Sequence, residues 1–247
     1  MRGAIAALLL AFAAGSTAAL PAGGCRGTLH LTLDTGNMAY AEAIAATLAR
    51  HDVKATFFLA NERTTRGDSA LDPAWSAFWA ARAAEGHAFG THTFRHGRFL
   101  RDAGAKVIYR PEFPATGEEM LDPAAVCAEL KRVDAAFRAA TGRPLDPLWR
   151  APGGRTTPNA LAAATACGYT HVGWAPAGFL GDELPSESHP NRKLVDAAVA
   201  KLKDGDVLMM HLGIWSRRDP FAPMLDELLK RLAARGFCFA PIPTGHR

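Results

Sequence analysis

Two histidines four residues apart, His92 and His96, can bring two imidazoles onto one divalent metal ion, most often zinc. They occur in the segment THTFRH, which follows a short apolar run ending in glycine and therefore indicates a loop above a sheet. Taken without context, histidines with this spacing are more often ordinary surface residues. The pair is a candidate metal site only if other reactive side chains join it.

Further side chains suited to chemistry stand at the ends of predicted strands. Asp34 follows an alternating apolar run and can act as a general base facing a metal, although DTGN also suits a plain turn or helix cap. His211 ends the run VLMMH and, taken alone, is typical of a buried core histidine. Arg150, beside a Pro-Gly turn, is equally suited to pairing with a surface acid, and Trp174 to the core.

Short apolar segments that alternate with Ala- and Leu-rich amphipathic segments must position these residues. The predicted strands are residues 28–33, 54–59, 87–90, 148–150, 169–174, 206–211 and 237–242. The predicted helices begin near residues 39, 72, 122, 158, 191 and 220, and most end at glycine. This alternation favours a parallel sheet with helical crossovers, closed as a barrel or doubly wound. In both cases ligands bind at the carboxyl ends of the strands, so the reactive residues should share one rim.

Composition and the first residues indicate one exported domain. The chain has 247 residues, of which 49% are hydrophobic and 21% charged, which suits an ordinary α/β domain and excludes disorder. Its 28 Lys and Arg residues form no block or stripe, so nucleic-acid binding is not expected. Residues 1–24 combine Arg2, an apolar run and small residues, which predicts a secretory signal peptide, with an uncleaved anchor as the alternative. Residues 25–247 contain no run long enough to span a membrane and are expected to be secreted or periplasmic.

Residues 97–121 interrupt the alternation. The segment is too long and irregular for an ordinary connection, so it predicts a lid-like loop or a small insertion, without assigned chemistry. Four cysteines, Cys25, Cys127, Cys167 and Cys238, allow three pairings, and an exported context favours disulfides over free thiols.

Several segments, in this order, resemble the polysaccharide deacetylases, the NodB-homology family of metal-dependent carbohydrate esterases. They are TLDTG (32–36), HTFRH (92–96), RAPGG (150–154) and LMMH (208–211), supported by VKATFFLANE (53–62) and AAEGHAFGTHT (83–93). The resemblance extends over roughly residues 28–242. It implies an α/β fold, a distorted seven-stranded (β/α) barrel, and a divalent metal, most often Zn²⁺, that assists removal of an acetyl group from a glycan.

Carried over by position, the resemblance implies that Asp34 is the catalytic base, Arg150 orients it, and His211 is the general acid. His92 and His96 fall on metal ligands. The metal would polarise the acetyl carbonyl and lower the pKa of bound water, while protonated His211 would donate to the leaving amine. Substrate contacts are expected from Trp174, Trp215, Pro152 and Gly154.

Two positions depart from the family pattern. The first motif of the family has two adjacent acids, and the second acid, a metal ligand, is here Thr35. A neutral hydroxyl is a poor ligand, so water completes the coordination sphere, another acid substitutes, or the metal is weakly held. After Trp174 the family's acid that orients the catalytic histidine is also absent, and Asp182 or Glu183 is expected in that role. Trp215 is expected to supply the missing aromatic wall.

The resemblance also implies a disulfide pairing. The family's barrel places its first and last strands side by side, which predicts Cys25–Cys238, and neighbouring helices predict Cys127–Cys167. The pairing therefore tests the barrel closure as well as the redox compartment.

Three functions follow from these observations. The first is an exported metal-dependent deacetylase of an acetylated glycan such as peptidoglycan, a chitin-like oligomer or an exopolysaccharide. The second is a pseudoenzyme that keeps the barrel but binds glycan without turnover, which Thr35 and the altered fourth motif motivate. The third is a deacylase of a non-glycan amide, with residues 97–121 reshaping the pocket.

Overall fold

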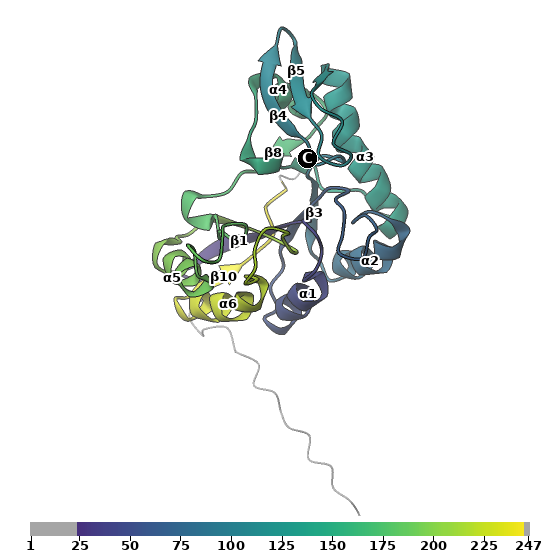
Figure 1. The fold of residues 1–247 in the computed structure, drawn as a ribbon. Helices are drawn as coiled ribbons and strands as arrows, with labels where there is room; N and C mark the ends of the chain where they lie inside the picture. The colour runs from purple at the N-terminus through teal and green to yellow at the C-terminus, as the bar shows by residue number, and fades with distance from the viewer. Residues whose placement is uncertain (1–23, 245–247) are drawn as a thin grey trace, which may run out of the picture.

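A computed structural model describes residues 24–244 of the chain (Figure 1). The predicted signal peptide therefore lies outside the described residues, except for its last residue. None of the helices within residues 24–244 combines the length and apolar character needed to cross a membrane.

Seven strands form the main sheet, and each of its ladders is parallel, as the alternation of elements predicts. The strand order is β10-β1-β2-β3-β7-β8, and β9 pairs with β1. The strands are β1 (Gly27–Asp34), β2 (Thr56–Leu59), β3 (Ala88–Thr91), β7 (Leu148–Trp149), β8 (Thr170–His171), β9 (Val207–His211) and β10 (Phe237–Phe239). Every predicted strand is present, although several are shorter than predicted, β8 and β10 most of all.

Irregular backbone closes the barrel between β8 and β9. The chain after β8 passes through the short helix η3 (Pro176–Gly178) and then follows β9. The Ala175 N–H donates to the carbonyl of Val207 at 3.1 Å, and Leu180 N–H donates to that of Met209 at 3.2 Å. A side chain at Gly178 would collide with the Val207 carbonyl, since a Cβ there would lie 1.9 Å from its oxygen. The fold is therefore the distorted (β/α) barrel that the resemblance implies.

Helices cover the outside of the barrel, and the predicted helices are present. They are α1 (Ala41–Arg50), α2 (Ser76–Ala84), α3 (Pro123–Thr141), α4 (Pro158–Ala166), α5 (Asn191–Lys201) and α6 (Leu225–Ala234), with short helices η1 (Pro73–Trp75), η2 (Pro152–Gly154) and η4 (Ala222–Met224). Asp122 caps α3 by accepting a hydrogen bond from Ala125 N–H, and Gly142 ends it in the left-handed region. Leucines of α6 at helical spacing face the main core, which gives that helix a clear inner side.

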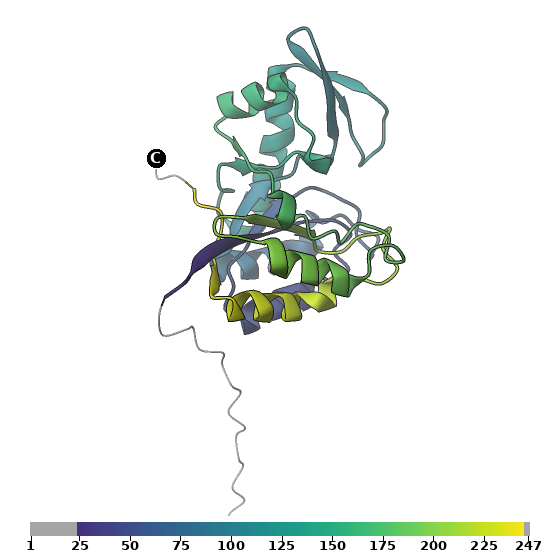
Figure 2. The ribbon, with the colours of Figure 1, turned by 90° about the vertical axis from the view of Figure 1, so that its left-hand side faces the viewer.

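Residues 97–121 form an insertion with its own small sheet, and not a lid-like loop. Its antiparallel strands are β4 (Arg98–Ala103), β5 (Lys106–Arg110) and β6 (Glu119–Leu121). Phe99 and Tyr109 pack with Leu130 of α3 in a second core. Figures 1 and 2 show this sheet rising beside α3 and α4, away from the barrel helices α1, α5 and α6.

Two disulfides join the predicted cysteine pairs. Cys25 bonds to Cys238, with Cα atoms 5.6 Å apart, and ties the start of β1 to β10. Cys127 of α3 bonds to Cys167 at the end of α4, with Cα atoms 5.9 Å apart. Both predicted pairings are confirmed, and the first one follows directly from the pairing of the first and last strands.

Candidate active site

The candidate residues meet at the carboxyl ends of the parallel strands. Asp34 ends β1 and His211 ends β9, and the strand register places these two residues directly opposite each other. His92 follows β3, and Arg150 follows β7. All four side chains are buried, so their charges interact in a medium that screens poorly.

Arg150 holds the Asp34 carboxylate inside the barrel. Its Nη1 donates to Asp34 Oδ1 at 2.9 Å and to Thr32 Oγ1 at 2.7 Å. Its Nε and Nη2 donate to the carbonyls of Val172 and Gly173, each at 3.1 Å, which fixes the guanidinium on both edges. Arg150 therefore has a positioning role toward Asp34 and no free face for solvent.

Asp34 is ionised in this setting. Burial by itself raises its pKa, but Arg150, His92 and His211 outweigh burial and hold the pKa below its ordinary value. An ionised carboxylate at the rim can accept a proton from a water molecule that attacks a substrate.

His92 is oriented by the backbone and is neutral. Its Nδ1 donates to the Arg150 carbonyl at 2.9 Å, which leaves Nε2 as the free nitrogen, 3.5 Å from Asp34 Oδ2. Burial is the largest influence on its pKa and lowers it to about 4. A neutral imidazole whose other nitrogen donates to a carbonyl is the usual state of a metal-ligating histidine.

His96 lies between two carboxylates that the sequence analysis did not single out. Its ring centroid is 4.9 Å from that of His92, across a compact turn in which Thr93 and His96 have positive φ angles of 62° and 49°. His96 Nδ1 is 2.7 Å from Glu112 Oε2 and 3.9 Å from Glu62 Oε1. Burial lowers the His96 pKa, but the two carboxylates outweigh it and the pKa is raised.

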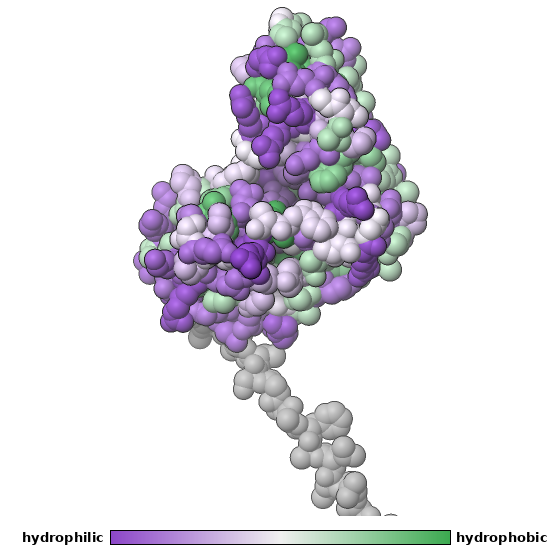
Figure 3. All heavy atoms as spheres, in the orientation of Figure 1, coloured by the Kyte–Doolittle hydropathy of each residue, from purple (hydrophilic) through white to green (hydrophobic). Residues whose placement is uncertain are grey.

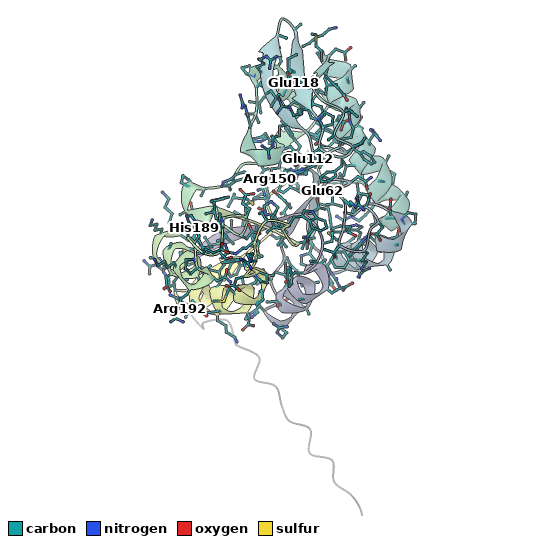
Figure 4. The ribbon with its side chains drawn as sticks, viewed as in Figure 1. Glu62, Glu112, Glu118, Arg150, His189 and Arg192 are labelled. Atoms are coloured by element: carbon teal, nitrogen blue, oxygen red, sulfur yellow. A yellow bond between two sulfur atoms is a disulfide. The ribbon has the colours of Figure 1, made fainter. Side chains whose placement is uncertain are left out.

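Glu62 and Glu112 come from different parts of the fold. Glu62 follows β2 at the same rim as Asp34, and Glu112 belongs to the insertion (Figure 4). The position of Glu62 just past a strand end was a usable sequence signal, within the segment VKATFFLANE. Glu112 carried no such signal, because nothing in residues 97–121 indicates that the insertion turns back to His96.

The Thr35 hydroxyl is hydrogen-bonded to neighbouring residues of the fold. The hydroxyl donates to the Glu62 carboxylate and accepts from Ala60 N–H at 3.2 Å. Gly36 N–H also donates to Glu62, at 2.8 Å from Oε2. Thr35 therefore holds a neighbouring acid in place.

Asp182 contacts His211 at two points. It accepts the His211 backbone N–H at 2.7 Å and lies 3.1 Å from ring Nδ1. Burial lowers the pKa of His211, but Asp182, with Asp34 and Glu62 farther away, raises it to about 10. Of the two acids expected near this histidine, Asp182 is therefore the one in contact, whereas Glu183 is exposed.

The expected substrate-contacting residues occupy different settings. The Trp174 ring lies over the Arg150 guanidinium, 5.5 Å from ring centroid to Cζ, and against Gly154, where a Cβ would be 2.6 Å from the indole. Pro152 is buried in η2, and Trp215 is 60% exposed on the loop after β9. Trp174 therefore forms a wall of the site, while Trp215 stands free in solvent.

A pocket of about 160 Å³ opens beside the general-acid candidate. Its lining includes His211, Asp182, Asn37, Tyr40, Arg217 and Phe221. Figure 3 shows the molecule hollowed where the insertion meets the barrel, with hydrophilic residues gathered there. A polar substrate can therefore approach this face of the protein.

The donor types at the rim fit a divalent metal such as zinc. His92 and His96 supply two imidazoles, and carboxylates surround them. Within residues 24–244 no three His, Cys, Asp or Glu side chains already converge as a ligand set. The residues thus provide suitable ligands, and the Thr35 hydroxyl is engaged with the Glu62 carboxylate.

Comparisons with known proteins agree with this fold. The family model described as polysaccharide deacetylase matches residues 23–172. The chitooligosaccharide deacetylase of Bradyrhizobium sp. (strain ANU 289) is 24% identical over 89% of this chain and 90% of its own. An acetyl xylan esterase of family 4 from Clostridium thermocellum, solved with a cobalt ion, has a TM-score of 0.66 at 19% identity, with 87% of each chain covered.

A pseudoenzyme of carbohydrate esterase family 4 from Bacillus anthracis is also similar. Its TM-score is 0.65 at 18% identity, and the match covers 87% of this chain but only 64% of that one. At such identities the structural likenesses establish the fold alone, and the same fold hosts both active and inactive proteins.

Proposed function

This chain belongs to the polysaccharide deacetylase family, and we propose that it is an exported, metal-dependent hydrolase that removes acetyl groups from an N-acetylated glycan. One observation carries the proposal. Asp34 and His211 lie side by side at the ends of the paired strands β1 and β9, with the pKa of the aspartate lowered and that of the histidine raised to about 10. Two titratable groups whose pKa values are moved apart in this way are suited to act as base and acid in one reaction.

The metal would be held by His92 and His96, together with a carboxylate. When bound, a zinc-type ion polarises the acetyl carbonyl and lowers the pKa of water. The proton transfers of the reaction are carried out by side chains of the protein, which accept and donate protons at defined atoms.

Asp34 accepts a proton from the attacking water, and Arg150 keeps its carboxylate in the position to do so. The water oxygen first bonds to the acetyl carbon, which becomes tetrahedral; the carbon–nitrogen bond then breaks, and the leaving sugar nitrogen needs a proton. His211 donates it from Nε2, because its Nδ1 is directed at Asp182. The products are acetate and a free amine.

The Bradyrhizobium relative makes a chitin-like oligomer the first substrate to test. The cobalt ion in the Clostridium thermocellum esterase supports metal dependence, and the two disulfides support export into an oxidising compartment. The Bacillus anthracis pseudoenzyme and the threonine at position 35 favour a second candidate, which is glycan binding without turnover.

Acetate release from chitooligosaccharides, in the presence of Zn²⁺ or Co²⁺, tests the proposal. We expect release by the wild-type chain and at least a 100-fold loss in Asp34→Asn, a nearly isosteric change that removes the base. Glycan binding without acetate release by the metal-loaded wild type would establish the pseudoenzyme. Release from N-acetylated amines or peptides, but from no glycan, would move the substrate to the non-glycan class.

A further inference from the structure

The acid missing at position 35 leaves the metal site one carboxylate short. Resting on the proposed function, we propose that Glu62 is the third metal ligand, beside His92 and His96, and that Thr35 is its positioning residue. Glu62 is the last residue of the segment VKATFFLANE, to which the resemblance assigned no role in the site.

The Glu62 carboxylate is fixed on one side and open on the other. Its Oε2 accepts from the Thr35 hydroxyl and from Gly36 N–H, the latter at 2.8 Å. Among residues 24–244 its Oε1 has no such donor, and it lies 3.9 Å from His96 Nδ1, the nitrogen that is 2.7 Å from Glu112. With one oxygen held by hydrogen bonds and the other beside the His96 ring, Glu62 is suited to act as a supported monodentate ligand.

The charge of Glu62 also calls for a cation. Its side chain is only 9% exposed, and within residues 24–244 its one ion-pair partner is His96, at 3.9 Å. No Arg or Lys in that range approaches it closely enough for an ion pair. A buried carboxylate whose ion-pair partner is a histidine 3.9 Å away is only partly compensated, and a divalent metal at the rim would reduce the cost of burying it.

The contact with Glu62 explains why residue 35 is a threonine. A hydroxyl donates to Glu62, whereas an aspartate there would place a second carboxylate against it. The carboxylate that the family pattern has at position 35 would thus be supplied by Glu62. The resulting ligand set of two histidines and one glutamate is one that catalytic zinc sites use with a fourth position left open.

Metal affinity tests the assignment without relying on activity. Metal-free protein and its variants are titrated with Zn²⁺ by competition calorimetry and with Co²⁺ by visible absorption. We expect Glu62→Gln to weaken Zn²⁺ binding by more than about 10-fold and to change the Co²⁺ spectrum. The control is Glu118→Gln, an exposed glutamate of the insertion far from the rim (Figure 4), which should bind as wild type.

A double-variant cycle separates this role from a structural one. Thr35→Val should weaken binding, because Glu62 loses its donor, and Thr35→Asp should restore affinity in the Glu62→Gln background. Wild-type affinity in Glu62→Gln, with binding lost in His92→Ala, would overturn the role of Glu62 and leave the proposed function intact. Wild-type affinity in His92→Ala as well would overturn the metal site itself. Thermal unfolding of each metal-free variant confirms that it is folded.

Discussion

The Asp182 carboxylate binds His211 at two points: it accepts a hydrogen bond from the His211 backbone N–H at 2.7 Å, and it lies 3.1 Å from Nδ1 of the His211 ring. One carboxylate therefore sets both the place of the histidine and its charge. Asp182 is not adjacent to His211 in any strand, since it follows η3 in the irregular backbone that closes the barrel. The segment that departs most from a regular strand thus supplies the partner of the general-acid candidate.

Removing the charge of Asp182 should move the alkaline side of the pH–rate profile. In Asp182→Asn the pKa of His211 should fall from about 10 toward its ordinary value, so the proton donor is lost at lower pH. The measurement is kcat/KM for acetate release between pH 5 and 10, with the exposed Glu183→Gln as the control. An alkaline limb that stays in place would contradict the pairing.

His211 should also make stability depend on pH. Its pKa in the folded protein, about 10, is above the ordinary value of 6.5, so its stabilisation is complete below about pH 6.5 and declines as the pH rises toward 10. Urea unfolding at pH 6 and pH 10 should show a larger loss in wild type than in His211→Gln. Equal losses in the two proteins would mean that the histidine is not charged in the fold.

Arg150→Met should destabilise the barrel strongly. The change leaves the Asp34 carboxylate buried without its partner and removes donors from two carbonyls, which costs about 3–5 kcal/mol of unfolding free energy. Urea denaturation measures this loss. Arg150→Lys keeps the charge, and it should recover stability in part while kcat stays low, because the ammonium cannot make all of these hydrogen bonds.

Glu112 links the insertion to the rim, and Glu112→Gln should weaken metal binding by about 10-fold through a less firmly oriented His96. Zn²⁺ titration measures the effect, again against Glu118→Gln. Equal Zn²⁺ affinities of Glu112→Gln and Glu118→Gln would mean that the insertion has no part in the metal site.

The Cys25–Cys238 disulfide should contribute more stability than Cys127–Cys167. The first joins residues 213 apart and the second joins residues 40 apart, and a longer closed loop restricts the unfolded chain more. Replacing each pair by serine should cost about 2–5 kcal/mol, with the larger loss for Cys25 and Cys238. Denaturation under matched non-reducing conditions compares the two, and the reverse order would contradict the chain-entropy argument.

The elements of this fold were predictable from local sequence. Period-two apolar runs and amphipathic helices bounded by glycine and proline predicted the seven strands and the helices around them. The ends of β8 and β10 were not predictable, because apolar residues continue past the last ladder hydrogen bond in both. The resemblance to the family added the disulfide pairing and the site residues, and the pairing is confirmed while the roles at the site stay predictions.

The sequence by itself determined which side chains stand at the strand ends. The end of each strand follows from the local apolar pattern, and a parallel sheet brings the carboxyl ends of its strands to one rim. Asp34, His92 and His211 were therefore found without coordinates. Only the tertiary structure decided that Glu62 turns back to Thr35, that Glu112 reaches His96, and that Asp182 and not Glu183 contacts His211. Those contacts depend on the path of irregular backbone, where a change in the dihedral angles of one residue decides whether a side chain points to solvent or to the site. Irregular backbone has no periodic sequence pattern from which that path could be predicted.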